Sequence, residues 1–185
     1  EILIGLVGSE MCIRDRNTMS KLGKRTDQRM AMLKNQVSEL LWYGQIETTV
    51  DRAKAVRSLA EKYITIAMRA YQDDVKVTKT VADAKGAKKE VVFTNDGPKK
   101  LAARRRLMAE LVDLQEIKGE KESKSAFRAR IKDTKHPLIE KMFKEYAPKY
   151  DARKNELGQG GGYTRILKTG TRRGDAAETC ILKLI

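Results

Sequence analysis

The chain has 185 residues, with 39 Lys and Arg against 25 Asp and Glu, which gives a formal net charge of +14. Such a surplus repels itself in a compact fold that lacks a polyanionic partner, so it favours nucleic acid as that partner. An anionic membrane surface would call for a basic amphipathic helix with exposed bulky apolar residues or a lipidation signal, and neither stands out, so we expect no membrane partner.

Cysteine and histidine, which often serve as nucleophiles, bases or metal ligands, are too few here for a reaction centre. The two cysteines, Cys12 and Cys180, cannot form a disulfide framework and lack the spacing of a zinc site. The single histidine, His136, stands in a His-Pro turn. We therefore expect no enzyme, no catalytic residue, no metal, no cofactor and no small-molecule substrate, and the cysteine usage fits a reducing cytoplasm.

Residues 1–18 do not match the chain that follows them. The apolar run at residues 2–7 is too short to span a membrane, and it lacks both the basic region and the cleavage signature of a signal peptide. The stretch resembles a translated sequencing-adapter read, in which case Met19 is the true start. The alternative is a genuine disordered leader.

A basic arm, residues 20–25, precedes the first predicted helix. The arm has no apolar period, so we expect a polyanion to order it. The helix begins with Thr26 or Asp27 as its cap and ends at Gly44, and its apolar residues recur at helical spacing: Met30, Leu33, Val37, Leu40 and Leu41. Trp42 is expected to pack inward, the alternative being a platform for base stacking.

A brief strand at residues 45–50 leads into a second helix. The strand is predicted from its β-branched residues, and Asp51 is the expected helix cap. The apolar stripe of the helix comprises Ala53, Val56, Ala60, Ile64 and Ala67.

The middle of the chain, residues 72–100, predicts an inserted hairpin. Its two β-favouring runs are residues 75–81 and 90–94. A strongly helix-forming segment follows at residues 101–114 and contains Arg104, Arg105 and Arg106. Three consecutive arginines fan around a helix, so at most two can face one partner, and both RNA contact and plain solubility remain open for them.

Two further elements precede the C-terminal segment. Residues 115–135 are charged, loop-like at 119–124 and helical in pattern around Phe127. Pro137 begins the last predicted helix, whose buried stripe is Leu138, Ile139, Met142, Phe143 and Tyr146. We expect Ala147-Pro148 to end this helix and residues 152–162 to form a glycine-rich connection.

The C-terminal segment predicts an antiparallel hairpin with a basic loop. Its strands are residues 163–168 and 178–185. The loop cations Lys168, Arg172 and Arg173 stand among glycines that let the backbone approach a surface, which suits binding to phosphates. Tyr163 either stacks on an unpaired base or covers the buried face of the hairpin.

Two motifs resemble a known family, the bacterial large-subunit ribosomal protein conventionally numbered seventeen. The first is IETTVDRAK at residues 46–54, continuing to YITIA at 63–67. The second is GGYTRILK at residues 161–168 with the loop GTRRGD at 170–175. The resemblance covers the arm, both early helices and everything from about Phe127 onward, whereas the insertion at about residues 72–100 departs from the shorter members.

The resemblance and the patterns together predict an α+β fold. We expect one compact domain over residues 19–185, with about four helices on a small mixed or antiparallel sheet that ends in the C-terminal hairpin. The resemblance implies a structural constituent of the bacterial large ribosomal subunit, located on the cytoplasmic ribosome near the nascent-chain exit tunnel. Its implied partners are large-subunit (23S) ribosomal RNA and neighbouring ribosomal proteins. The alternative is a free-standing basic nucleic-acid-binding module.

The expected RNA contacts come from the arm, the first two helices and the C-terminal hairpin. For most of them the family is the source, and for the hairpin loop the basic pattern adds support. The residues are Lys21, Lys24, Arg25, Arg29, Lys34, Arg52, Lys54, Arg57, Tyr163, Arg165, Lys168, Arg172 and Arg173.

Overall fold

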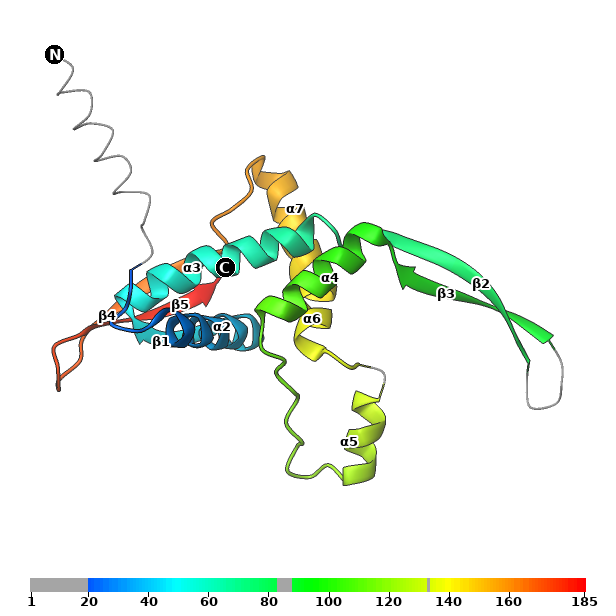
Figure 1. Ribbon diagram of the computed structural model, residues 1–185, viewed down its shortest axis with the longest axis horizontal. Helices are drawn as coiled ribbons and strands as arrows, with labels where there is room; N and C mark the ends of the chain where they lie inside the picture. Colours follow the sequence, from blue (N-terminus) through cyan, green and yellow to red (C-terminus); the bar gives the residue numbers. More distant parts are fainter. Residues whose placement is uncertain (1–19, 83–87, 133) are drawn as a thin grey trace, which may run out of the picture.

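Two long helices, α2 (Thr26–Tyr43) and α3 (Val50–Met68), form the centre of the molecule (Figure 1). The structure is a computed structural model that describes residues 20–82, 88–132 and 134–185, so the leader predicted at residues 1–18 lies outside the described residues. The stripe predicted for α3 is confirmed, because all five of its residues are fully buried: Ala53, Val56, Ala60, Ile64 and Ala67.

Gly44 ends α2, as predicted. Its φ of +81° lies in the left-handed region that favours glycine, and its N–H donates to the Leu40 carbonyl at 2.8 Å. Trp42, which was expected to pack inward, is half-buried against the core. The ammonium of Lys141 lies 5.6 Å from the centroid of the Trp42 ring.

The starts of both helices differ from the prediction. Arg25 and Thr49 occupy the N-cap positions, and neither makes a side-chain capping hydrogen bond. Thr26 is the first residue of α2, while Asp27 and Asp51 lie inside the first turns. The positive end of the helix dipole stabilises a carboxylate in the first turn. This explains why acidic residues stand there although they do not cap the helix.

Three antiparallel strands pack one face on α2 and α3. In the order β1-β5-β4, these strands are Gln45–Thr49, Glu178–Leu184 and Thr164–Thr171. Leu182 of the central strand pairs with Ile46 on one side and Ile166 on the other. The predicted hairpin is confirmed, and the α+β fold class with it. The pairing of β1 with β5 joins segments from opposite ends of the described chain.

The inserted hairpin is also confirmed and projects as a separate ribbon (Figure 1). Its strands are β2 (Asp74–Ala82) and β3 (Lys88–Asp96), and the link at residues 83–87 lies outside the described residues. At the base of the ribbon, the Asp73 carboxylate accepts a hydrogen bond from the Lys99 N–H at 2.7 Å. A Cβ at Gly97 would lie 2.4 Å from that carboxylate, so this close approach requires glycine.

The helix after the ribbon is shorter than predicted at its C-terminal end. Helix α4 is Pro98–Glu110, and Leu111 is extended, with φ of −104° and ψ of 155°. Leu111 is buried, and the N–H of Val112 donates to the buried hydroxyl of Ser38 at 2.9 Å. Anchoring of the chain to α2 at this point explains why the helix stops although its sequence favours continuing.

Beyond this anchor the chain forms a projection around α5 (Lys124–Ile131), which buries no residue. Arg130 pairs with Glu116 and Glu122, and its guanidinium lies 5.5 Å from the ring centroid of Phe127. This projection has no buried core of its own, and its ion pairs are partly exposed to solvent.

The last helical segment does not end at Pro148, which corrects the prediction. It comprises α6 (Pro137–Lys141), a π-helical turn (Met142–Tyr146) and α7 (Ala147–Leu157). In the π turn, the Ala147 N–H donates to the carbonyl of Met142, five residues back. Pro148 lacks an N–H and would clash with the carbonyl four residues back in a regular α-helix, so a wider turn suits it. The predicted buried stripe is confirmed.

Gly158 ends α7 with φ of +66°, so the glycine-rich connection begins later than predicted. It runs over residues 158–163 to β4.

Candidate nucleic-acid interface

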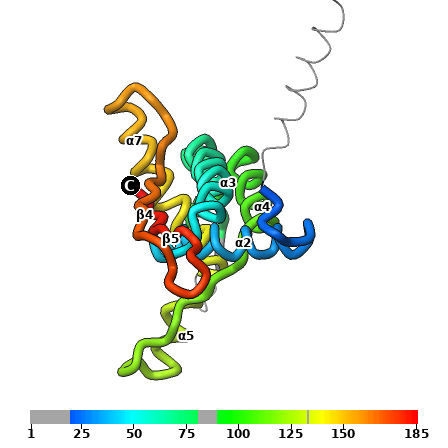
Figure 2. Tube along the Cα trace, turned by 90° about the vertical axis from the view of Figure 1, so that its left-hand side faces the viewer, coloured from blue at the N-terminus to red at the C-terminus, as the bar shows by residue number. Residues whose placement is uncertain are grey.

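Most of the predicted cations gather at one end of the molecule, which we call the basic end. The arm and the β4–β5 loop lie there, on either side of the first turns of α2 and α3 (Figure 1). In Figure 2 the arm is blue and the loop is red. Three segments far apart in the sequence therefore lie at the basic end. Its cations are Lys21, Lys24, Arg25, Arg29, Arg52, Lys54, Arg57, Lys168, Arg172 and Arg173.

Some cations of the basic end pair with acids on their own segments. The Nε of Arg25 lies 3.6 Å from Oδ1 of Asp27, and the Nζ of Lys54 lies 3.7 Å from Oδ1 of Asp51. All four side chains are exposed, and exposed pairs contribute little to stability because water competes for both partners. A phosphate can therefore replace either acid at low energetic cost.

The β4–β5 loop keeps its shape through Arg172. This guanidinium donates to both carboxylate oxygens of Asp175, at 2.9 and 2.6 Å. The hydrogen bonds from Arg172, and then the one from the Ala177 N–H, lower the pKa of the Asp175 carboxyl. Arg173 is exposed and makes no ion pair with any residue that the structure describes. The two arginines thus differ: Arg172 shapes the loop, while Arg173 presents an unpaired charge.

Two predicted cations lie away from the basic end. The Lys34 ammonium donates to the Ala109 carbonyl at 3.0 Å, so it links α2 to α4. Arg165 is exposed on the outer face of the sheet, in register with Lys183 of β5. Sequence reasoning missed Lys183, although its alternation with the buried residues of β5 would have placed it on that face.

Tyr163 is buried, which corrects its assignment as a base-stacking residue. It is only 3% exposed, and its ring centroid lies 4.7 Å from that of Tyr150. The other interpretation is confirmed: Tyr163 covers the buried side of the hairpin. Tyr150 is fully buried, and this burial raises its pKa to about 12.

The arginine triplet divides between the interior and the surface. The Arg104 side chain is 20% exposed and bonds Asp96 and Glu140, whereas Arg105 and Arg106 are exposed. Arg104 therefore serves the fold, and two arginines remain for a partner.

Metal binding and nucleophilic chemistry each require particular groups in a suitable setting. No cluster of three or more His, Cys, Asp or Glu side chains within the described residues is placed to hold a metal ion. Cys180 is fully buried, and burial raises the pKa of its thiol, which disfavours the nucleophilic thiolate. None of the described helices is long and apolar enough to cross a membrane. The exposed cations suit attraction of a polyanion.

Comparison with known proteins points to one family. The family model described as ribosomal protein L17 matches residues 32–185. A protein of Lachnospira eligens named large ribosomal subunit protein bL17 is 38% identical over 185 residues, covering 89% of this chain and 97% of the relative. Proteins of the same name from Clostridium acetobutylicum and Acetivibrio thermocellus are 38% and 37% identical, each over 89% of this chain and over 95% and 97% of the relatives.

Proposed function

The chain belongs to the ribosomal protein L17 family, and from this premise we propose that it binds large-subunit ribosomal RNA through its basic end. As a member of this family it is a structural constituent of the large ribosomal subunit and not an enzyme. One observation carries the proposal: the arm, two helix starts and the hairpin loop bring their cations to a single end of the molecule.

The basic end binds by charge neutralisation. Each phosphate that it neutralises releases condensed counterions, so affinity falls as salt rises. On the order of eight contacts would lose about three to five powers of ten in affinity between about 50 and 200 mM salt. The arm adds three exposed cations ahead of α2, while its Leu22 packs against the core.

We place the protein near the rim of the nascent-chain exit tunnel, beside other large-subunit proteins. The family resemblance supports this position. The β2–β3 ribbon and the α5 projection extend from the body and offer surfaces to such neighbours (Figure 1).

Co-sedimentation tests the proposal. The native protein should remain with large subunits through a moderate salt wash on a sucrose gradient, with a soluble cytosolic protein as the control. Recovery mainly in the post-ribosomal fraction would contradict the proposal and favour a free-standing nucleic-acid-binding module.

Filter binding to a 23S ribosomal RNA transcript tests the loop. Arg173→Ala should weaken binding and reduce the salt slope by roughly one, with no change in melting temperature. Arg172→Ala should likewise remove one positive charge and, in addition, the guanidinium that bonds Asp175. Arg128→Ala, an exposed arginine on α5, is the matched control. If the double variant of Arg172 and Arg173 binds like the wild type across salt, the loop is not part of the interface.

A further inference from the structure

A groove runs along the outward side of α3, between this helix and the glycine-rich connection after α7. Figure 2 shows α3 between that connection and α4. Two adjoining hollows of about 440 and 320 Å³ make up the groove, and both are lined by Thr65, Arg69, Gly161 and Tyr163. It lies along the second half of α3, beyond the part that belongs to the basic end.

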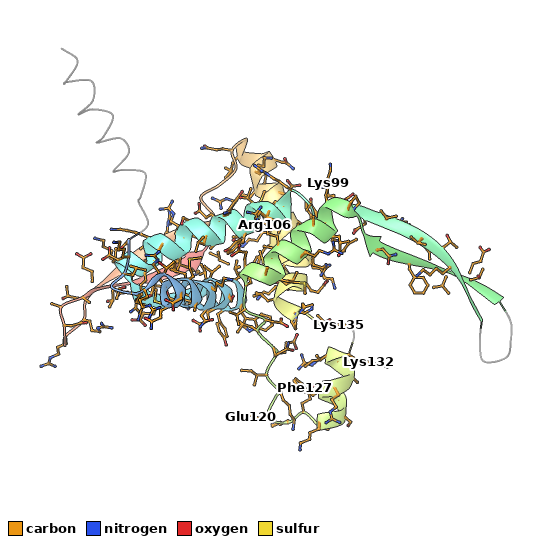
Figure 3. The ribbon with its side chains drawn as sticks, in the orientation of Figure 1. Lys99, Arg106, Glu120, Phe127, Lys132 and Lys135 are labelled. Atoms are coloured by element: carbon orange, nitrogen blue, oxygen red, sulfur yellow. The ribbon has the colours of Figure 1, made fainter. Side chains whose placement is uncertain are left out.

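Cations from three separate elements line this groove. Lys62 comes from α3, Arg69 follows this helix directly as its C-cap, Arg106 comes from α4 and Lys154 from α7. All four side chains are exposed, and none makes an ion pair with another residue of the described ranges. Figure 3 shows Arg106 where α4 runs beside α3. Four positive charges therefore converge on one depression.

The acids that line the groove are already engaged by the fold. Glu61 accepts a hydrogen bond from the Thr164 hydroxyl at 2.8 Å and lies 3.5 Å from Arg57. Asp151 accepts one from the Tyr71 hydroxyl at 2.8 Å. Four cations thus face two carboxylates, and these carboxylates hold the walls together. The net charge of the lining stays positive.

The glycine connection gives the groove an accessible backbone. Gly161 lines both hollows with a φ of +107°, and no atom lies within 4 Å of the position that a Cβ would take there. Among the described residues, no acceptor is hydrogen-bonded to its N–H. Amides that are free of side chains and partners can donate to phosphate oxygens, as in other anion-binding loops.

We propose that this groove binds the sugar-phosphate backbone of an RNA strand, as a second RNA-binding surface beside the basic end. The inference rests on the proposed function and extends it to residues that sequence reasoning did not place in the interface. The groove contacts backbone rather than bases, because its aromatic ring, Tyr163, is buried and cannot stack. Its open, elongated form suits a chain of phosphates better than a single anion.

A triple variant tests the groove by filter binding to a 23S ribosomal RNA transcript across salt. Lys62→Ala, Arg69→Ala and Arg106→Ala together should reduce the salt slope by roughly two to three and weaken binding at every salt concentration. The matched control removes the same charge from exposed positions on the α5 projection, with Lys121→Ala, Lys132→Ala and Lys135→Ala. Figure 3 labels Lys132 and Lys135. If both triple variants have the melting temperature of the wild type, the fold is intact in both.

Directed cleavage of the RNA tests whether an RNA strand lies in the groove. An iron chelate on Gly160→Cys should cut ribosomal RNA in the bound complex, because Gly160 lines the groove and a Cβ there makes only ordinary contacts, the nearest at 3.6 Å. Cys12 is changed to Ser, and Cys180 is buried and escapes labelling. A chelate on Ile117→Cys, 83% exposed near α5, is the control for non-specific cutting.

The outcomes separate the two proposals. If the wild-type protein shows no salt-dependent binding to ribosomal RNA, the proposed function itself fails. If the wild type binds but the groove variant keeps the slope of the control variant, the groove is overturned and the basic end stands. Absence of cleavage from residue 160 in a complex that forms normally also overturns the groove.

Discussion

Replacing Arg104 with Ala should destabilise the fold, because this side chain joins three elements. Its guanidinium donates to Asp96 at the end of β3 and to Glu140 in α6, the latter at 2.5 Å. It also lies 5.2 Å from the centroid of the Phe143 ring. Arg104 therefore links the base of the ribbon, α4 and α6.

The magnitude follows from the exposure of the two acids. A hydrogen bond to a charged group contributes about 1.5–3 kcal/mol. The side chains of Asp96 and Glu140 are 20% and 25% exposed, so each partly regains water when Arg104 is removed. We therefore expect a loss of about 2–3 kcal/mol rather than the full sum. At about 2–4 °C per kcal/mol for a chain of this length, the melting temperature falls by roughly 5–10 °C.

Acid should reduce this difference. The hydrogen bond from Arg104 lowers the pKa of Asp96 from its ordinary value of 3.8. Burial acts to raise the pKa of Glu140, but hydrogen bonds from Arg104 and Lys144 outweigh it and lower the pKa from 4.5. Because both carboxyls have lower pKa values in the folded state, their stabilisation is fully present above about pH 4.5 and is lost as pH falls through the lowered values.

Thermal unfolding followed by circular dichroism between about pH 7 and pH 3 provides the measurement, with Arg105→Ala as the matched control, since Arg105 is an exposed neighbour. The gap between wild type and Arg104→Ala should narrow below about pH 4. If Arg104→Ala melts together with Arg105→Ala at neutral pH, Arg104 does not hold these elements together.

Three further changes probe the core and the arm. Ser38→Ala should cost about 1–3 kcal/mol in urea unfolding, because the Val112 N–H loses its buried acceptor; an unchanged midpoint would show that water or another group satisfies it. Leu182→Ala should cost about 2–5 kcal/mol in the same assay, since this side chain is fully buried in the central strand, and a loss below about 1 kcal/mol would contradict that packing. Changing Lys21, Lys24 and Arg25 together to Ala should reduce the salt slope of RNA binding by roughly two to three and leave the melting temperature unchanged, because all three side chains are exposed; an unchanged slope would exclude the arm cations from the interface.

The sequence predicts those elements whose signal is local. The stripe of α3 and the strands of both hairpins follow from spacing over a few residues, and the structure confirms them. The helix that continues past Pro148 was missed, because a π turn widens the backbone where a regular helix would clash. The early stop of α4 was missed as well, because the cause is a hydrogen bond to Ser38 in a distant helix.

The same limit applies to the candidate interface. The types of its residues can be read from the sequence, but which cations share a surface depends on tertiary contacts. The ammonium of Lys34 is held by α4, and the ring of Tyr163 is held by Tyr150, so neither is free as the patterns suggested. Conversely, Lys62 and Arg106 come together only because α3 and α4 pack side by side.

The strand order has a consequence for how the protein is made. The central strand β5 follows every other described element in the sequence, while β1 is synthesised early. Until β5 emerges from the ribosome that makes it, β1 and β4 lack their shared neighbour, and the apolar inner sides of α2 and α3 have no sheet to cover them. Such long-range pairing slows folding and leaves partly synthesised chains prone to aggregation until the sheet closes.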